Sequence, residues 1–158
     1  MSNVREYERY HGIVLTRIVS DAGRSIAIAH HSSNDKASYV LDGRLGLYIK
    51  YSSKRLSPWR FSFLKTHQEE IEILKNTYSE VCVSLVCGID GVAVLSHQQL
   101  KEVLDEEFDS IESISVKRRR SGMYDVRGSN GKLRFKVAQS DCPRKILDCL
   151  ATGAGRVP

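Results

Sequence analysis

The chain has 158 residues, of which 41% are hydrophobic and 27% charged, and this composition predicts one folded domain over residues 1–158. No apolar run approaches the ~18 residues of a membrane helix, and the first twelve residues lack the apolar core of a secretory signal. We therefore expect a cytoplasmic protein with no membrane partner. The formal net charge is +5, but residues 115–136 alone carry +7, so the basic character is local. A polyanion-binding surface is the function that such a local excess favours.

The first half of the chain predicts a helix followed by strands. Apolar residues recur at helical spacing from Tyr7 to Ile18, which indicates a helix over residues 4–19 that ends near Gly23. Residues 25–31, 38–41 and 46–52 read as strands, the last two joined by a turn at Asp42-Gly43. Residues 60–64 are ambiguous between a short strand and an extended segment. Thr66 then has the position of an N-cap for a helix over residues 67–78, with Glu69 as its capping partner.

The second half begins with a strongly apolar segment. Residues 81–87 are apolar almost without alternation, as expected of a central strand covered on both faces, and a further strand ends at Leu95. Ser96 is a predicted N-cap for a helix over residues 97–108. Strands are expected at 114–120, 123–128 and 132–138, with Asn130-Gly131 marking a hairpin, before a short helix that starts at Cys142. The four cysteines form no CxxC pair, and we interpret them as reduced structural residues.

This order of helix, three strands, helix and strand resembles the core of the PD-(D/E)XK, or restriction endonuclease-like, nuclease superfamily. The resemblance covers residues 4–95 and predicts a mixed β-sheet flanked by helices. Residues 96–140 would extend this αβββαβ core with a helix and a basic β-hairpin, and residues 141–158 would form a C-terminal tail.

The resemblance also implies a catalytic site. In that superfamily an aspartate near the second strand and an acidic-x-lysine motif on the third hold a divalent metal, normally Mg²⁺, and activate water. Asp42 and Lys50 are the corresponding residues here, but Tyr48 occupies the acidic position. Some members supply the missing carboxylate from the next helix, where this chain has Glu69 and Glu70. The implied catalytic set is Glu8, Asp42, Lys50, Glu69 and Glu70, with Asp42 and Glu70 as metal ligands.

Each of these residues also has a purely structural interpretation. Asp42 before Gly43 is typical of a tight turn, Lys50 can face solvent from a strand, and Glu69 can serve only as the capping partner of Thr66. The five histidines have no HxxxH or Cys partner in the sequence, which argues against a zinc site.

Two basic segments predict a nucleic-acid-binding surface. In residues 50–61 cations alternate with Trp59 and Phe61, a mixture suited to phosphates and bases, although both aromatic residues can equally be core anchors. Further cations follow on the C-terminal strands, where they can contact a phosphate backbone or simply protect an edge strand. The predicted binding residues are Lys54, Arg55, Arg60, Lys117, Arg118, Arg119, Arg120, Arg127 and Arg134.

Three functions follow from these patterns. The first is a metal-dependent DNA endonuclease, and the second is a nuclease-like DNA-binding or interaction module in which Tyr48 marks a lost metal site. The third is a protein-binding module without nucleic acid, such as a homodimer formed through the exposed hairpin.

Overall fold

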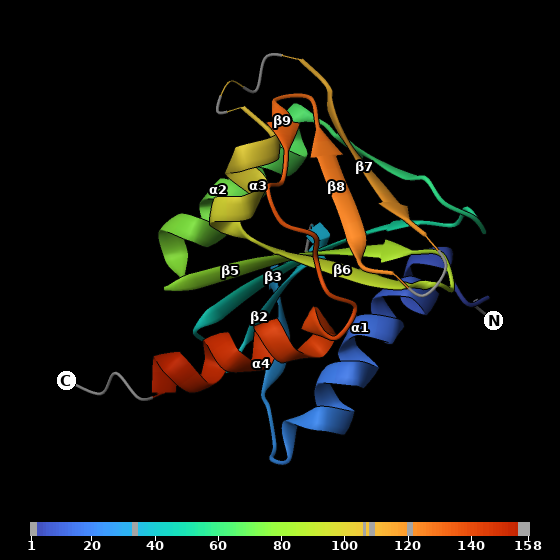
Figure 1. The fold of residues 1–158 in the computed structure, drawn as a ribbon. Coiled ribbons are helices and arrows are strands. Elements are labelled where there is room, and N and C mark those ends of the chain that lie inside the picture. The colour runs from blue at the N-terminus through green and yellow to red at the C-terminus, as the bar shows by residue number, and fades with distance from the viewer. Residues whose placement is uncertain (1–2, 33–34, 106, 108–109, 120–121, 155–158) are drawn as a thin grey trace.

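The computed structural model describes residues 3–32, 35–105, 107, 110–119 and 122–154. These residues form a mixed α/β fold, as predicted (Figure 1). The helices are α1 (Glu6–Ala22), α2 (Lys65–Thr77), α3 (His97–Val103) and α4 (Asp141–Ala154). The strands are β1 (Ile28–Ser32), β2 (Asp35–Leu41), β3 (Leu45–Ser52), β4 (Trp59–Phe63), β5 (Glu80–Cys87), β6 (Gly91–Ser96), β7 (Glu112–Arg118), β8 (Tyr124–Gly128) and β9 (Gly131–Lys132).

Five strands form a mixed sheet in the order β1-β2-β3-β5-β6. Strands β1, β2 and β3 are an antiparallel meander, and β3 then pairs with β5 in parallel, a connection that requires the crossover through α2. Helices α1 and α4 lie together against one face of this sheet, as Figure 1 shows. Their apolar residues, including Val14, Ile18 and Ile146, pack there on Leu47 and Ile49 of β3.

The other face of the mixed sheet is covered by α2, α3 and a second, antiparallel sheet in the order β4-β7-β8-β9 (Figure 1). Trp59, Phe61 and Phe63 alternate inward along β4, with Arg60 and Ser62 facing solvent. The predicted mixed sheet is present, and the ambiguous segment at 60–64 is strand β4. Because β4 pairs with β7, the C-terminal strands belong to a second sheet of four strands, which is more than the expected hairpin extension.

Several local predictions are confirmed. Helix α1 ends at Ala22 and is capped by Gly23, which adopts the left-handed conformation. The Ser96 hydroxyl accepts a hydrogen bond from the Gln99 amide at 3.1 Å and caps α3. Ser129 and Asn130 connect β8 to β9 in the expected hairpin, and β5 is the predicted central strand, buried on both faces. All four cysteines are free.

Other boundaries differ from the sequence prediction. Helix α2 begins at Lys65 with Leu64 as its N-cap, so Thr66 is not the cap. Helix α3 ends at Val103 and not at residue 108, since Leu104 is already extended. The expected strand over 132–138 is mostly wrong: β9 ends at Lys132, and the chain rejoins β8 only through a bridge between Val137 and Tyr124.

Among the described residues, no helix combines the length and the apolar composition needed to cross a bilayer.

Candidate functional site

A cavity of about 400 Å³ opens where β3 and the first turn of α2 meet α1 and β2. Its volume lies within the usual range for small-ligand sites. Residues from all four elements line it, and most of their side chains are aromatic or ionisable: Tyr7, His11, Lys36, Tyr48, Lys50, Tyr51, His67 and Glu70. The cavity therefore combines ring surfaces with cations and one carboxylate.

Lys50 and His67 form a close pair in this cavity. The Lys50 ammonium donates a hydrogen bond to Nδ1 of His67 at 3.0 Å, and the Leu64 amide donates to the same nitrogen at 3.2 Å. The Lys50 nitrogen also lies 4.9 Å from the centre of the Phe63 ring. Burial lowers the pKa of Lys50 from 10.5 to about 8, although the nearby Glu70 carboxylate opposes this shift.

Tyr48 and Glu70 form a second pair beside the first. The Tyr48 hydroxyl, on a side chain that is 2% exposed, donates to Oε2 of Glu70 at 3.1 Å. Two of the residues predicted to be catalytic, Lys50 and Glu70, are therefore brought together. The pairing arises because β3 and the first turns of α2 pack against each other.

The side chains of this cavity do not fit the Mg²⁺ ion that the resemblance implied. A magnesium site needs oxygen ligands, normally including carboxylates, and Glu70 is the single carboxylate among the described lining residues. The residue paired with Tyr48 on the neighbouring strand β2 is Ser38, which carries a hydroxyl and adds no carboxylate beside Tyr48. Within the ranges that the structure describes, no three His, Cys, Asp or Glu side chains gather closely enough to hold a metal.

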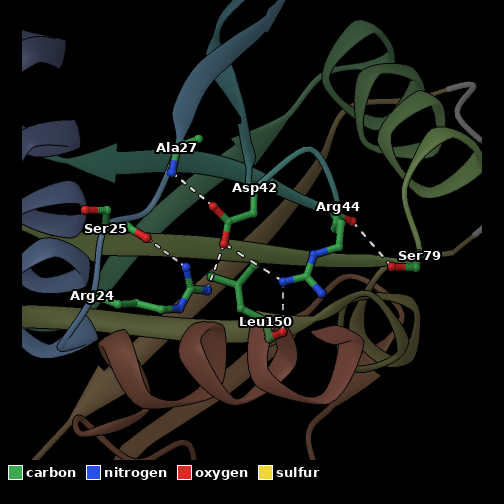
Figure 2. Close-up of polar contacts among 7 residues, drawn as sticks. All are labelled: Arg24, Ser25, Ala27, Asp42, Arg44, Ser79 and Leu150. Carbon is green, nitrogen blue, oxygen red and sulfur yellow. Dashed lines mark hydrogen bonds and ion pairs between the residues drawn. The ribbon is translucent and has the colours of Figure 1, made fainter. Parts of the chain in front are cut away.

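Asp42 lies away from the cavity, in the turn between β2 and β3 (Figure 2). Lys50 is five residues along β3 from its start at Leu45, so its backbone lies roughly 17 Å along the strand from the end that follows the Asp42 turn. Asp42 forms an ion pair with Arg24 at 2.8 Å and accepts the Ala27 amide hydrogen at 3.0 Å. The hydrogen bond from Arg24 lowers the pKa of the Asp42 carboxyl.

These contacts give Asp42 a structural role in the turn, whereas the resemblance implied a role as a metal ligand. Arg44 is a second cation near this carboxylate, 3.9 Å away, and it also donates to the Leu150 carbonyl near the end of α4, as Figure 2 shows. Asp42 therefore fastens the β2–β3 turn to the segment after α1.

The two remaining acidic candidates do not line the cavity. Glu8 is exposed on α1, and Glu69 is exposed on α2. Glu70 is the residue of the Glu69-Glu70 pair that points into the cavity. Two histidines line the cavity, His11 and His67, and neither was selected from the sequence as a site residue. The i, i+3 spacing of His67 and Glu70 indicates a shared helix face.

A second candidate site is the solvent-facing side of the second sheet. Arg60 on β4 pairs with Ser115 on β7, Ser115 with Arg127 on β8, and Arg127 with Lys132 on β9. Because directly paired residues point to the same face, these four side chains form a row across all four strands. We call this set the cross-strand row. At a strand spacing of ~4.8 Å the row spans roughly 14 Å.

The surroundings of the row are also basic. Lys117 is exposed two residues further along β7 from Ser115, on the same face, and it pairs with Asp125. Lys132 and Lys136 lie 3.9 and 3.8 Å from the same carboxylate, so Asp125 faces three cations. Within the described part of this face it is the one acid, and the net charge stays positive.

Some predicted nucleic-acid contacts have internal roles. Arg118 makes a two-pronged ion pair with Asp90, whose carboxylate also accepts the Tyr124 hydroxyl at 2.9 Å. The hydrogen bond from Arg118 lowers the pKa of Asp90. Trp59 is 2% exposed and donates its indole hydrogen to the Lys54 carbonyl, so Trp59 is a core anchor, as is Phe61.

The other predicted cations in the described part of the chain are exposed. Lys54 donates to the Pro58 carbonyl at 3.0 Å, and Arg55 and Arg119 lie at the rim of a cavity beside Asp90. Arg120 lies outside the described residues. Arg134 is exposed and stands over the Phe135 ring at 5.9 Å.

Phe135 is an aromatic residue in the segment that the sequence predicted to be a strand over 132–138. A regular strand over 132–138 would have placed it inward with Leu133 and Val137, both of which are buried. Since the chain leaves the sheet after Lys132, Phe135 instead points outward and is 76% exposed. It follows the last member of the cross-strand row by three residues.

No family model, no curated protein and no solved structure matches this chain. The fold and the two candidate sites are therefore interpreted from their own geometry.

Proposed function

We propose that this protein is a DNA-binding domain that holds the sugar-phosphate backbone on the outer face of the second sheet. The observation that carries the proposal is the cross-strand row, in which cations from three strands flank a serine. Arginine, lysine and serine side chains are frequent partners of phosphate oxygens. A row of roughly 14 Å matches about four nucleotides along one strand, at ~3.4 Å each.

Exposed groups at the end of the row support the same function. An exposed aromatic ring can stack on a base that is not paired, and such stacking contributes about 1–3 kcal/mol per base. Phe135, with Arg134 over its ring, has the exposure that this contact needs. The phosphates would then be held by the row and an unpaired base by Phe135.

A relationship to the PD-(D/E)XK nucleases is part of this proposal. The succession of α1, the β1–β2–β3 meander, α2 and the parallel strand β5 supports it, with β4 inserted before α2. Tyr48 stands at the acidic position of the superfamily motif, and Asp42 lies away from the cavity. We therefore propose that the protein binds DNA and does not hydrolyse it with a metal.

Metal-dependent hydrolysis of DNA is the second candidate function. One observation favours it, namely that Lys50 and Glu70 line the same cavity. Against it, Glu70 is the one carboxylate among the described residues of that cavity, which is too few for a magnesium site. The two candidate functions differ in whether DNA is cleaved when Mg²⁺ or Mn²⁺ is present.

The test compares DNA binding by two variants that remove the same charge. Fluorescence anisotropy with duplex and single-stranded DNA, and with RNA, would be measured for Arg60→Ser/Arg127→Ser and for the control Lys75→Ser/Arg144→Ser, whose side chains are exposed on α2 and α4. We expect the first variant to bind DNA at least roughly tenfold more weakly and the control to bind like the wild type. Equal weakening of both, or no binding by the wild type, would contradict the proposal.

The same preparations would be incubated with labelled DNA in Mg²⁺, Mn²⁺ or EDTA. We expect no cleavage. Metal-dependent cleavage that is lost in both Lys50→Ala and Glu70→Gln would establish the nuclease function in place of the binding function.

A further inference from the structure

The surroundings of Lys50 are those of a nucleophile. Its nitrogen lies 4.9 Å from the centre of the Phe63 ring and 3.0 Å from Nδ1 of His67, in a cavity that Tyr7, Tyr48 and Tyr51 also line. A lysine becomes a nucleophile when an apolar environment favours its neutral amine, and when a base within hydrogen-bonding distance can take its proton.

His67 is positioned to be that base. The Leu64 amide donates to Nδ1 at 3.2 Å, and the ammonium of Lys50 donates to the same atom at 3.0 Å. Both donors require a lone pair on Nδ1, so the hydrogen of the neutral ring lies on Nε2. The N-terminal turn of α2 therefore holds the acceptor nitrogen toward Lys50.

From this geometry we infer that Lys50 forms an imine with the aldehyde of a ring-opened sugar phosphate, such as the base-free deoxyribose of an abasic site in DNA. The DNA form of the substrate rests on the proposed function, whereas imine formation does not. The burial that lowers the pKa of Lys50 to about 8 leaves roughly a tenth of the amine neutral at pH 7. This fraction is roughly 300 times that of an ordinary lysine.

The reaction balances without an oxidant or a metal. The ammonium first gives a proton to His67, and the neutral amine attacks the carbonyl carbon, so that an N–C bond forms and the C=O π bond breaks. The oxygen takes a proton from the imidazolium. The hydroxyl then leaves as water with a second proton from the nitrogen, so that one amine and one aldehyde give one imine and one water.

The other groups of the cavity suit this substrate. The protonated imine is a cation, and the Glu70 carboxylate, held by the Tyr48 hydroxyl at 3.1 Å, is the anion that stabilises it. Lys36 is exposed at the cavity and can pair with the phosphate. Tyr7 and Tyr51 line the same cavity.

The test is reductive trapping with sodium borohydride, which adds hydride to an imine carbon and makes the bond permanent. Two probes distinguish the source of the aldehyde: a DNA duplex with one abasic site, and free 2-deoxyribose 5-phosphate. Intact-protein mass spectrometry followed by peptide mapping locates the adduct. We expect it on Lys50, with a loss to background in Lys50→Arg and no change in the control Lys75→Arg.

The pH dependence and the His67→Ala variant separate a reacting lysine from one that is merely accessible. With the wild type, the trapping rate should rise with pH up to about 8 and then level. With His67→Ala it should fall roughly 100-fold while the adduct stays on Lys50. Circular dichroism and thermal unfolding of Lys50→Arg and His67→Ala would establish that both variants remain folded.

The outcomes distinguish this inference from the proposed function. If abasic DNA is bound but neither probe is trapped on Lys50, the imine inference is wrong and DNA binding stands. If the free sugar phosphate is trapped on Lys50 but no DNA is bound, Lys50 is a nucleophile as inferred, and the assignment of DNA as its substrate is wrong. Adducts spread evenly over exposed lysines would also overturn the inference.

Discussion

Asp42 has a φ angle of 53°, a left-handed conformation that aspartate and asparagine tolerate better than alanine. Its carboxylate binds Arg24 and the Ala27 amide. Both features serve the turn, and neither depends on a ligand. The resemblance grouped Asp42 with Lys50 in one site, but Asp42 lies in the turn before β3 and Lys50 lies near the other end of that strand.

Replacing Asp42 therefore tests the distinction between stability and catalysis. We expect Asp42→Ala to lower the free energy of unfolding by about 1–2 kcal/mol, from backbone strain and the lost hydrogen bonds. Asp42→Asn should lose less, because asparagine keeps the turn conformation. Urea unfolding measures the stability of both variants, and fluorescence anisotropy measures their DNA binding, which we expect to be unchanged. A loss of DNA binding in a folded Asp42→Asn protein would return Asp42 to the functional site.

Lys50 makes stability depend on pH. Its pKa is about 8 in the folded protein against 10.5 ordinarily, so between these values the unfolded chain binds more protons and stability rises with pH. Below pH 8 the folded state carries the whole cost of charging a buried amine. This cost is about 1–3 kcal/mol after allowing for partial exposure and for the hydrogen bond to His67.

Lys50→Met removes this cost. We expect the variant to be more stable than the wild type at pH 7 by about 1–3 kcal/mol, with the difference shrinking toward zero near pH 10.5. Urea unfolding of both proteins at several pH values between 7 and 10.5 measures it. A variant that is less stable at pH 7, or a difference independent of pH, would show that Lys50 is not desolvated.

At the scale of elements, the sequence predicted what depends on neighbouring residues. Helix α1 follows from its apolar spacing, β5 from its unbroken apolar run, and the start of α3 from the Ser96 cap. The second sheet could not be predicted in this way, because β4 pairs with β7 across some fifty intervening residues. Periodicity shows which face of a strand is apolar, but not which strand lies beside it.

The junction of α3 with β8 offers a test of how the second sheet is held. A Cβ atom on Gly128 would lie 2.2 Å from the Val103 carbonyl oxygen, an atom of the backbone that cannot easily move. We expect Gly128→Ala to destabilise the protein by about 2–3 kcal/mol. Chemical denaturation measures this change.

The control for that variant is Gly12→Ala in α1, where a Cβ atom would meet nothing within 4 Å. Alanine favours a helix over glycine by about 0.5–1 kcal/mol, so this variant should be more stable than the wild type. Equal effects of the two substitutions would show that β8 and α3 are not packed as described.

At the scale of the whole molecule, the candidate sites were only partly predictable. The local excess of positive charge indicated a basic surface, and Arg60 and Arg127 were among its predicted members. Their alignment through Ser115 depends on strand register, which one sequence does not reveal. Likewise the resemblance placed Lys50 and Glu70 in one site. The contact between His67 and Lys50 could not be predicted, because it depends on where α2 begins. The homodimer remains a prediction.

The salt dependence of DNA binding tests the central claim most directly. For duplex DNA, a plot of the logarithm of the association constant against the logarithm of the salt concentration has a slope of about −0.9 for each phosphate contact. We therefore predict a steep negative slope for the wild type. Arg60→Ser/Arg127→Ser should reduce it by about 1.8, and Lys75→Ser/Arg144→Ser should leave it unchanged. A wild-type slope near zero, or the same slope for all three proteins, would contradict phosphate binding by the cross-strand row.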